Sequence, residues 1–176
     1  MNDTKKNNFK FYSILIALVV VIIATVSVTV WALLSKDKNK ITPDYAPVGL
    51  EKNAEPMNDN EEKLNHSEGG SSVGIIYAKE LTVNLTSRKI ELLFANPSRS
   101  NQDMVIAVVI QDCILVTSGR ITPGNKITNL KLNKDATDRL TAGGYNGTII
   151  ISCYDPKSGE KSLINTEISV LINVTE

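Results

Sequence analysis

Apolar and polar residues alternate along the C-terminal part of the chain. Leu81, Val83 and Leu85 alternate with polar neighbours, and Ile90 to Phe94 repeats the same pattern. A period of two is typical of half-buried strands. Further apolar runs cover 104–110, 114–117, 127–132, 148–154 and 163–174. The pattern therefore predicts seven strands between residues 73 and 176, with one short helical turn at 133–140.

Turn residues separate these runs. Asn96-Pro97 ends the second strand, Thr122-Pro123-Gly124-Asn125 forms a turn, and Asp155 to Gly159 connects the last two strands. The run 104–110 is apolar on both faces. Such a run indicates a central strand covered on both sides, or a strand that also packs on something outside the core. In the helical turn, Asn133 is the candidate N-cap, and Leu140 is expected to attach the turn to the core.

Seven strands in about 100 residues predict an all-β fold, an immunoglobulin- or fibronectin-III-like antiparallel β-sandwich. Tyr145 follows a glycine turn at the start of the sixth strand. The tyrosine corner of such domains lies there, and its hydroxyl bonds back to the chain. Strand parity then directs Gly147, Ile149, Ile151 and Cys153 inward. We assign structural roles to Tyr145, Pro123 and Gly124.

Two cysteines, Cys113 and Cys153, fall in this part of the chain. If the third and sixth strands pair antiparallel, Cys113 lies beside the start of the sixth strand and Cys153 lies at its other end. The separation is then about 24 Å, whereas a disulfide needs Cα atoms within about 7 Å. We therefore predict two free thiols, with Cys153 buried and Cys113 in or near a turn.

The N-terminal part contains an apolar run over residues 11–34 without a charge. A helix of this length reaches about 36 Å, enough to cross a hydrocarbon core of about 30 Å. Tyr12 and Trp31 lie near its ends, where aromatic residues prefer the membrane interface. The run predicts a transmembrane helix. A cleaved signal peptide is the alternative, but its apolar core usually has about 7 to 15 residues.

The lysines on the two sides of this run balance, so charge alone does not orient it. The apolar segment follows only ten residues and can act as an export signal for the chain after it. We expect residues 1–10 to be a cytoplasmic tail and the C-terminal domain to lie outside the cell. The predicted location is thus the plasma membrane, with a single pass.

Residues 35–72 carry more acidic than basic residues, three prolines and a Gly-Gly-Ser-Ser end. Such composition predicts a disordered acidic linker, with an end-to-end distance of about 30 to 40 Å. Within it, Tyr45 and Pro47 belong to an apolar stretch that reaches Leu50. We consider this stretch a candidate docking segment for a partner, with a solvated stalk as the alternative.

Charge and histidine content narrow the function further. Nineteen Lys and Arg balance nineteen Asp and Glu, which argues against a nucleic-acid binder with a strongly basic face. The single histidine, His66, falls in the linker, so triads of the Ser-His-Asp or Cys-His type are excluded. One histidine and two cysteines do not cluster as zinc ligands. We predict no catalytic residue, no metal, no cofactor and no small-molecule substrate.

Several passages together carry a resemblance. They include Tyr45-Ala46-Pro47-Val48, Phe94-Ala95-Asn96-Pro97, Ser118-Gly119-Arg120-Ile121-Thr122-Pro123-Gly124 and Gly143-Gly144-Tyr145. The chain resembles an uncharacterised group of single-pass surface proteins of Gram-positive bacteria, of the kind common in Clostridia. The resemblance covers about residues 45–175 and implies location and architecture. It brings no activity with it.

Two function classes follow. In the first, the sandwich is a non-enzymatic binding or assembly module that grips a protein or cell-wall partner. Its expected contacts are the polar loop 98–102 with Arg99, Asn101 and Gln102, or an exposed sheet edge, or the segment with Tyr45 and Pro47. In the second, the chain is an accessory subunit of a membrane complex, and the transmembrane helix makes the specific contacts. Ala24, Thr25 and Ser27 are the small residues that favour such packing.

Overall fold

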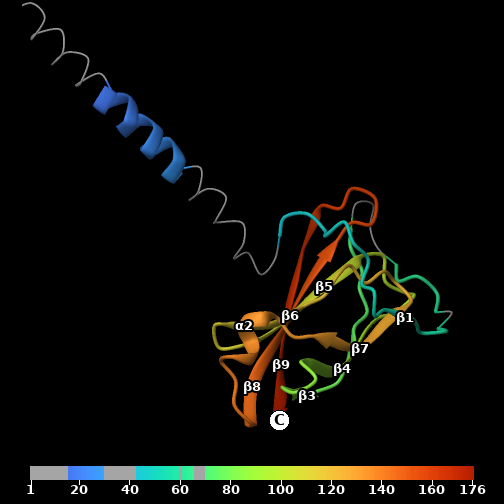
Figure 1. The fold of residues 1–176 in the computed structure, drawn as a ribbon. Coiled ribbons are helices and arrows are strands. Elements are labelled where there is room, and N and C mark those ends of the chain that lie inside the picture. The colour runs from blue at the N-terminus through green and yellow to red at the C-terminus, as the bar shows by residue number, and fades with distance from the viewer. Residues whose placement is uncertain (1–15, 30–42, 60, 66–69) are drawn as a thin grey trace, which may run out of the picture. The chain divides into compact units, whose positions relative to one another are not determined.

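The computed structural model describes residues 16–29, 43–59, 61–65 and 70–176 (Figure 1). The chain divides into two compact units, one up to Lys40 and one from Ile41 onward. The first contains a helix over residues 16–29. Within the described residues, no helix combines the length and apolarity needed to cross a membrane. The predicted transmembrane segment, 11–34, extends beyond the described helix at both ends, and the predicted tail, 1–10, lies outside the described residues.

The second unit is all-β, as predicted. All seven expected strands are present, and two short strands of two residues each precede them. The elements are β1 (Glu55–Pro56), β2 (Ile76–Tyr77), β3 (Glu80–Asn84), β4 (Lys89–Asn96), β5 (Asp103–Ile110), β6 (Cys113–Thr117), β7 (Asn125–Lys131), α2 (Lys134–Thr137), β8 (Gly143–Tyr154) and β9 (Lys161–Thr175).

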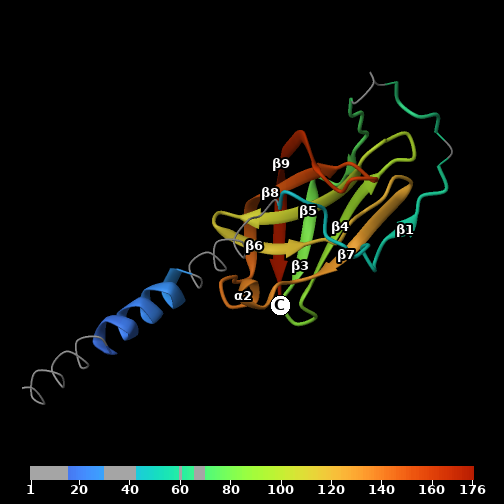
Figure 2. The same ribbon diagram turned by 90° about the horizontal axis from the view of Figure 1, so that it is seen from above.

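The strands form one curled sheet (Figure 2). Their order is β1-β7-β4-β3-β9-β8-β5-β6, and β2 pairs with β4. This differs from the expected antiparallel sandwich, because β3 joins the two halves. It pairs antiparallel with β4 and parallel with β9, where Glu80 lies beside Leu171. Only the last five residues of the long strand β9 reach β3. Among the strands that the structure describes, the first part of β9 pairs with β8 and not with β3.

The core lies inside this curled sheet. Every residue of β5 is buried, which confirms that this strand is covered on both faces. Met104, Ile106 and Val108 belong to the core cluster. The predicted parity of β8 is also confirmed, because Ile149 and Ile151 join the same cluster. Both cysteines are free, with Cys153 buried and Cys113 half-buried.

The predicted structural residues occupy the expected turns. The Tyr145 hydroxyl donates to the Thr141 carbonyl at 3.0 Å, the backbone bond expected of it. Gly124, which follows Pro123, has a φ of 83°, and its N–H donates to Asn96 at 2.7 Å. A positive φ suits glycine, which has no Cβ to clash with the backbone. Asn133 precedes α2, but its side-chain amide donates to the Ile114 carbonyl and makes no capping hydrogen bond to the helix.

Residues 43–59 differ most from expectation. The sequence predicts a disordered linker here, whereas the structure pairs this segment with the sheet at several points. We call residues 43–59 the strap. Its strand β1 pairs with β7, and its two ends are tied by backbone hydrogen bonds, from Lys161 to Asp44 at 3.0 Å and from Met57 to Gly124 at 2.9 Å. The physical reason lies in backbone groups, which hydrogen-bond to a sheet edge whatever the composition of their side chains.

Candidate functional site

The strap presents apolar side chains to solvent while its backbone is fixed. Tyr45 forms a bridge with Glu160, and the Ala46 N–H donates to the Gly159 carbonyl at 2.8 Å. The Tyr45 side chain is nevertheless 63% exposed, and Val48 is 97% exposed. Pro47 is half-buried. Apolar side chains held outward on an ordered backbone are typical of interaction surfaces.

A second group of contacts holds the middle of the strap. The Arg120 N–H donates to the Gly49 carbonyl at 3.0 Å, and the Glu51 N–H donates to the Arg120 carbonyl at 2.9 Å. The Glu51 carboxylate accepts a bond of 2.6 Å from the Gly119 N–H. A charged acceptor makes this hydrogen bond stronger than a neutral one. Glu51 therefore anchors the part of the strap that carries Val48 and Leu50.

Arg120, which bonds to the strap through its backbone, also forms an ion pair with a buried carboxylate. Arg120 Nε lies 3.3 Å from Asp103 Oδ2, and the Asp103 side chain is almost fully buried. Burial raises the pKa of the Asp103 carboxyl above its usual value, and attraction to Arg120 opposes that rise in part. Near the start of the strap, the Tyr154 hydroxyl donates to the Pro43 carbonyl at 2.9 Å. Two buried polar side chains, Asp103 and Tyr154, thus lie beneath the strap attachment, where their strands pair.

The predicted partner-binding loop has other contacts. Ser72 N–H donates to Asn101 Oδ1 at 2.8 Å, and Asn101 N–H donates to the Ser72 carbonyl at 3.0 Å. Arg99 forms an ion pair with Glu61 at 3.3 Å. Gln102 is only 4% exposed, which removes it from the surface. The structure therefore brings Arg99, Asn101 and Gln102 together in one loop, but this loop holds the chain's own preceding segment.

The same loop makes further hydrogen bonds to that segment. Ser98 N–H donates to Asp59 Oδ2 at 2.9 Å, and the Glu61 N–H donates to Ser98 Oγ at 3.0 Å. The Lys63 ammonium donates to the Ser100 carbonyl at 2.7 Å. These residues lie 37 to 39 positions apart in sequence. Contacts between residues so far apart leave no pattern in the sequence, and so the sequence analysis missed those of Asp59 and Glu61. It missed the contact of Glu51 for the same reason, since its partner Gly119 is 68 positions away.

The helix over residues 16–29 carries the small residues expected to pack against other helices. Its hydroxyls are used internally. Thr25 Oγ1 donates to the Ile22 carbonyl at 2.9 Å, and Ser27 Oγ donates to the Ile23 carbonyl at 2.8 Å. Such bonds within a helix satisfy the hydroxyl without a neighbour. The hydroxyls of Thr25 and Ser27 are therefore already hydrogen-bonded within the helix. Any packing against a second helix would depend on the small size of these side chains.

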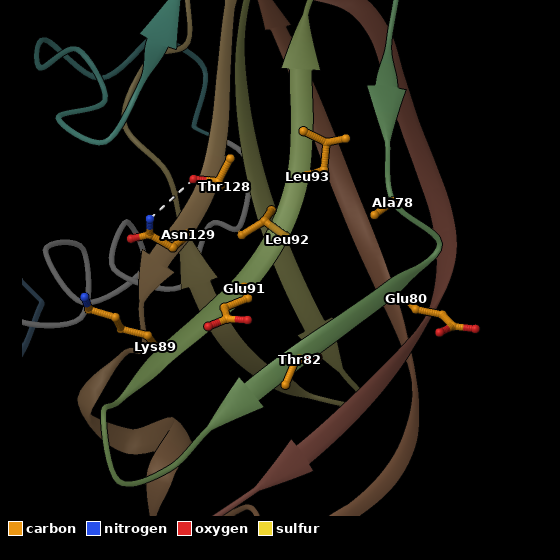
Figure 3. Close-up of a pocket in the computed structure, with 9 residues that line it drawn as sticks. All are labelled: Ala78, Glu80, Thr82, Lys89, Glu91, Leu92, Leu93, Thr128 and Asn129. Carbon is orange, nitrogen blue, oxygen red and sulfur yellow. Dashed lines mark hydrogen bonds between the residues drawn. The ribbon is translucent and has the colours of Figure 1, made fainter.

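An open hollow lies on the outer face of β3, β4 and β7 (Figure 3). The figure shows Glu80 and Thr82 on β3 and Lys89 and Glu91 on β4 along one face. Its lining is mostly polar and, apart from Leu92, half-buried to exposed, whereas small-molecule sites are usually enclosed and mostly apolar. Within the described part of the chain, no three His, Cys, Asp or Glu residues cluster in a way that would hold a metal ion. The strap is therefore the stronger candidate site.

Comparisons with known proteins add little. No protein-family model and no curated protein matches the chain. Among solved structures, the chain is similar to that titled "Crystal Structure of the Periplasmic Chaperone SfaE", with a TM-score of 0.29 and 11% sequence identity. The match covers 58% of this chain and 58% of that one. A similarity at this level says nothing about what the chain binds.

Proposed function

We propose that the chain is a membrane-anchored, non-enzymatic binding or assembly module that presents its β domain outside the cell. The uncharged run 11–34 supports the anchor. The exposed apolar side chains of the strap support a protein or cell-wall partner. We further propose that the curled sheet is a variant of the immunoglobulin-like sandwich. The bond between Tyr145 and Thr141 and the pairing of β5 with β8 support this fold.

One observation carries the binding proposal. Tyr45 and Val48 point outward from a strap whose backbone is hydrogen-bonded on both sides of them, at Lys161 and Arg120. A flexible stalk would lose conformational freedom on binding, at about 1 to 2 kcal/mol per residue. The strap is already ordered, so its apolar side chains bind a partner without that loss. This is the pre-organisation that favours specific recognition.

Site-specific crosslinking on intact cells tests the proposal. A photoreactive residue at Val48 should yield a defined adduct, whose partner is then identified by mass spectrometry. Leu171 is the matched control, because it is also apolar and exposed but lies on β9. The same adduct from both positions, or none from Val48, would remove the strap from the binding surface.

The accessory-subunit function remains the second candidate, because Ala24, Thr25 and Ser27 favour helix packing. Replacing residues 11–34 by an unrelated membrane anchor separates the two functions. Binding through the strap survives this replacement, whereas assembly through the helix is lost. Co-purification of the same partner with both anchors therefore supports the strap, and loss of the partner supports the helix.

The proposed location has its own test. Protease added to intact cells with an opened cell wall should remove the β domain and leave the N-terminal tail protected. An epitope at each terminus makes both fragments visible. Full protection of the C-terminal epitope would contradict the orientation without affecting the binding proposal.

A further inference from the structure

We propose that the free edge of β9 pairs antiparallel with β9 of a second copy of this chain, centred on Thr166. The resulting dimer extends the sheet across two protomers. It depends neither on the strap nor on the membrane anchor, and it adds an interaction surface to the proposed function.

Among the described strands, the first part of β9 has a partner on one side only. Its other side pairs with β8 throughout, from Ser152 beside Asn165 to Gly143 beside Val174. On the open side, the Lys161 N–H donates to the Asp44 backbone carbonyl at 3.0 Å, and the Leu171 N–H donates to the Lys79 backbone carbonyl at 2.9 Å. Within the described part of the chain, no backbone hydrogen bond is made on this side between those two positions. The unpaired stretch of β9, which we call the window, therefore lies between Lys161 and Leu171, whose N–H groups are already hydrogen-bonded.

Strand geometry identifies the groups that this window presents. Backbone N–H and C=O groups of alternate residues point to the same side of a strand. Lys161 and Leu171 both bond outward, so the odd-numbered residues between them also point outward. Asn165, Glu167 and Ser169 lie in the regular part of the strand, where register with β8 is continuous. Their side chains are exposed, and an edge of this kind is a template for another strand.

The core is incompletely covered along the same edge. Ile164 and Ile168 pack on the core but stay half-buried, and so do Val73 and Ile75 on the preceding segment. Ser71 Oγ lies 2.9 Å from Ser162 Oγ, which brings that segment close to the start of β9. The edge therefore combines unpaired backbone groups with apolar side chains that an added strand would cover. Covering them supplies the hydrophobic part of the association.

The sequence of the edge is complementary to itself. An antiparallel pair centred on Thr166 places Asn165 opposite Glu167 of the second copy, and Ile164 opposite Ile168. Asn165 and Glu167 are then hydrogen-bonded pairs, so the two copies exchange about four backbone bonds. Aliphatic pairs and Thr–Thr pairs across strands are favourable. A register centred on Glu167 would instead oppose two carboxylates, and like charges directly opposite are destabilising. The charge pattern thus favours the register centred on Thr166 over the one centred on Glu167.

Charge substitutions test the register in the full chain in detergent. With Asn165→Glu, each copy places a new carboxylate opposite Glu167 of the other copy, so the dimer contains two such like-charge pairs. We expect the dimer dissociation constant to rise by about fivefold to thirtyfold. Adding Glu167→Lys to the same chain restores opposite charges and should restore the dimer. Asn173→Glu is the matched control, because Asn173 is exposed on β9 but its backbone pairs with β3. Sedimentation velocity over a concentration series measures each constant.

A cysteine placed at the two-fold axis gives an independent test. In the proposed register Thr166 lies opposite itself in a non-hydrogen-bonded pair, with Cα atoms about 4.5 Å apart, which is within disulfide range. Thr166→Cys should therefore form a disulfide-linked dimer on mild oxidation, whereas Asn173→Cys should not. The unsubstituted chain reports any background from Cys113. Circular dichroism and thermal unfolding confirm that each variant is folded.

Three results would overturn the proposal. The first is an unsubstituted chain that remains monomeric at the highest concentration measured. The second is a dimer that persists unchanged in Asn165→Glu, which would assign association to the apolar helix. The third is a double variant that fails to regain the dimer while it stays folded.

Discussion

Asn101 and Ser72 exchange two hydrogen bonds. Ser72 N–H donates to the Asn101 side-chain oxygen at 2.8 Å, and Asn101 N–H donates to the Ser72 carbonyl at 3.0 Å. Asn101 was expected to contact a partner, but its side chain instead binds the segment of the same chain that precedes β2. The Asn101 amide nitrogen extends the clamp to the Gly70 carbonyl at 3.3 Å.

Removing this clamp should destabilise the domain. We expect Asn101→Ala to lower the free energy of unfolding by about 1 to 2 kcal/mol, because it leaves the Ser72 N–H without its acceptor. Urea unfolding followed by circular dichroism measures the change. Asn129→Ala is the matched control, since within the described residues the Asn129 side chain makes a single, long hydrogen bond of 3.5 Å, to Thr128. Equal losses in the two variants would contradict the clamp.

A methyl group at Gly119 should displace the strap. A Cβ there would lie 2.9 Å from the Glu51 nitrogen and 3.0 Å from the Leu50 carbonyl carbon, both backbone atoms that move only with the strap. We expect Gly119→Ala to speed hydrogen exchange of the Glu51 amide by at least about tenfold, as local opening becomes easier. A Cβ at Gly49, on the strap itself, meets nothing within 4 Å. Gly49→Ala should therefore leave that exchange rate unchanged, and fast exchange in both variants would point to a general loosening.

Asp103 and Asp155 should shift the pH dependence of stability in opposite directions. Burial raises the Asp103 pKa in the folded state, so its favourable contribution is complete below pH 3.8 and is lost as pH rises through the raised pKa. Backbone N–H bonds from Ser158 and Lys157 lower the Asp155 pKa, so its contribution is present above 3.8 and is lost as pH falls through the lowered pKa.

Urea unfolding from pH 2 to 7 checks both signs. Relative to the unsubstituted chain, Asp103→Asn should gain stability as pH rises, because the cost of ionising a buried carboxyl disappears. Asp155→Asn should lose stability over the same rise. If the stability changes of the two variants depend on pH with the same sign, one of the two pKa shifts has the opposite direction to that stated above.

The two thiols should react in sequence. Burial raises the pKa of Cys153 to about 11, and its side chain lies in the core. The thiolate is the reactive form, so Cys153 should resist alkylation in the folded state at pH 8. Cys113 is half-buried. We expect one thiol to be modified in the native protein and two in denaturant, counted by mass spectrometry. Cys113→Ser should then show no modification until the chain unfolds.

The β domain was predictable because its strands are local patterns. Period-two alternation identified β3 and β4, and the uniformly apolar run identified β5 as a strand buried on both faces. The tyrosine after a glycine turn predicted the bond to Thr141. Each of these signals lies within a dozen residues, and each corresponds to a side chain that must be either inside or outside the core.

The strap and the sheet edge were not predictable in the same way. Backbone groups of Ala46 and Glu51 hold the strap, and backbone groups carry no sequence signal. Acidic, proline-rich composition predicts disorder because few apolar groups are available to bury. Pairing with Arg120 and Gly159 overrides that tendency locally. The parallel contact between β3 and β9 likewise depends on how far β9 continues past β8, which no single strand pattern encodes.

The strap also has a mechanical consequence. A pull on the chain ahead of Pro43, balanced by a partner holding the β domain, reaches the bonds at Tyr154 and Gly159 before it reaches any long strand. These bonds lie along the strap at separate points, so a steady load breaks them one after another. Releasing residues 43–59 adds about 60 Å of extended chain while the curled sheet stays folded. In a pulling experiment we expect this length to appear as small early steps, before the single large rupture of the sheet. Under a load carried by the β domain itself, the strap is then the first part of the domain to yield.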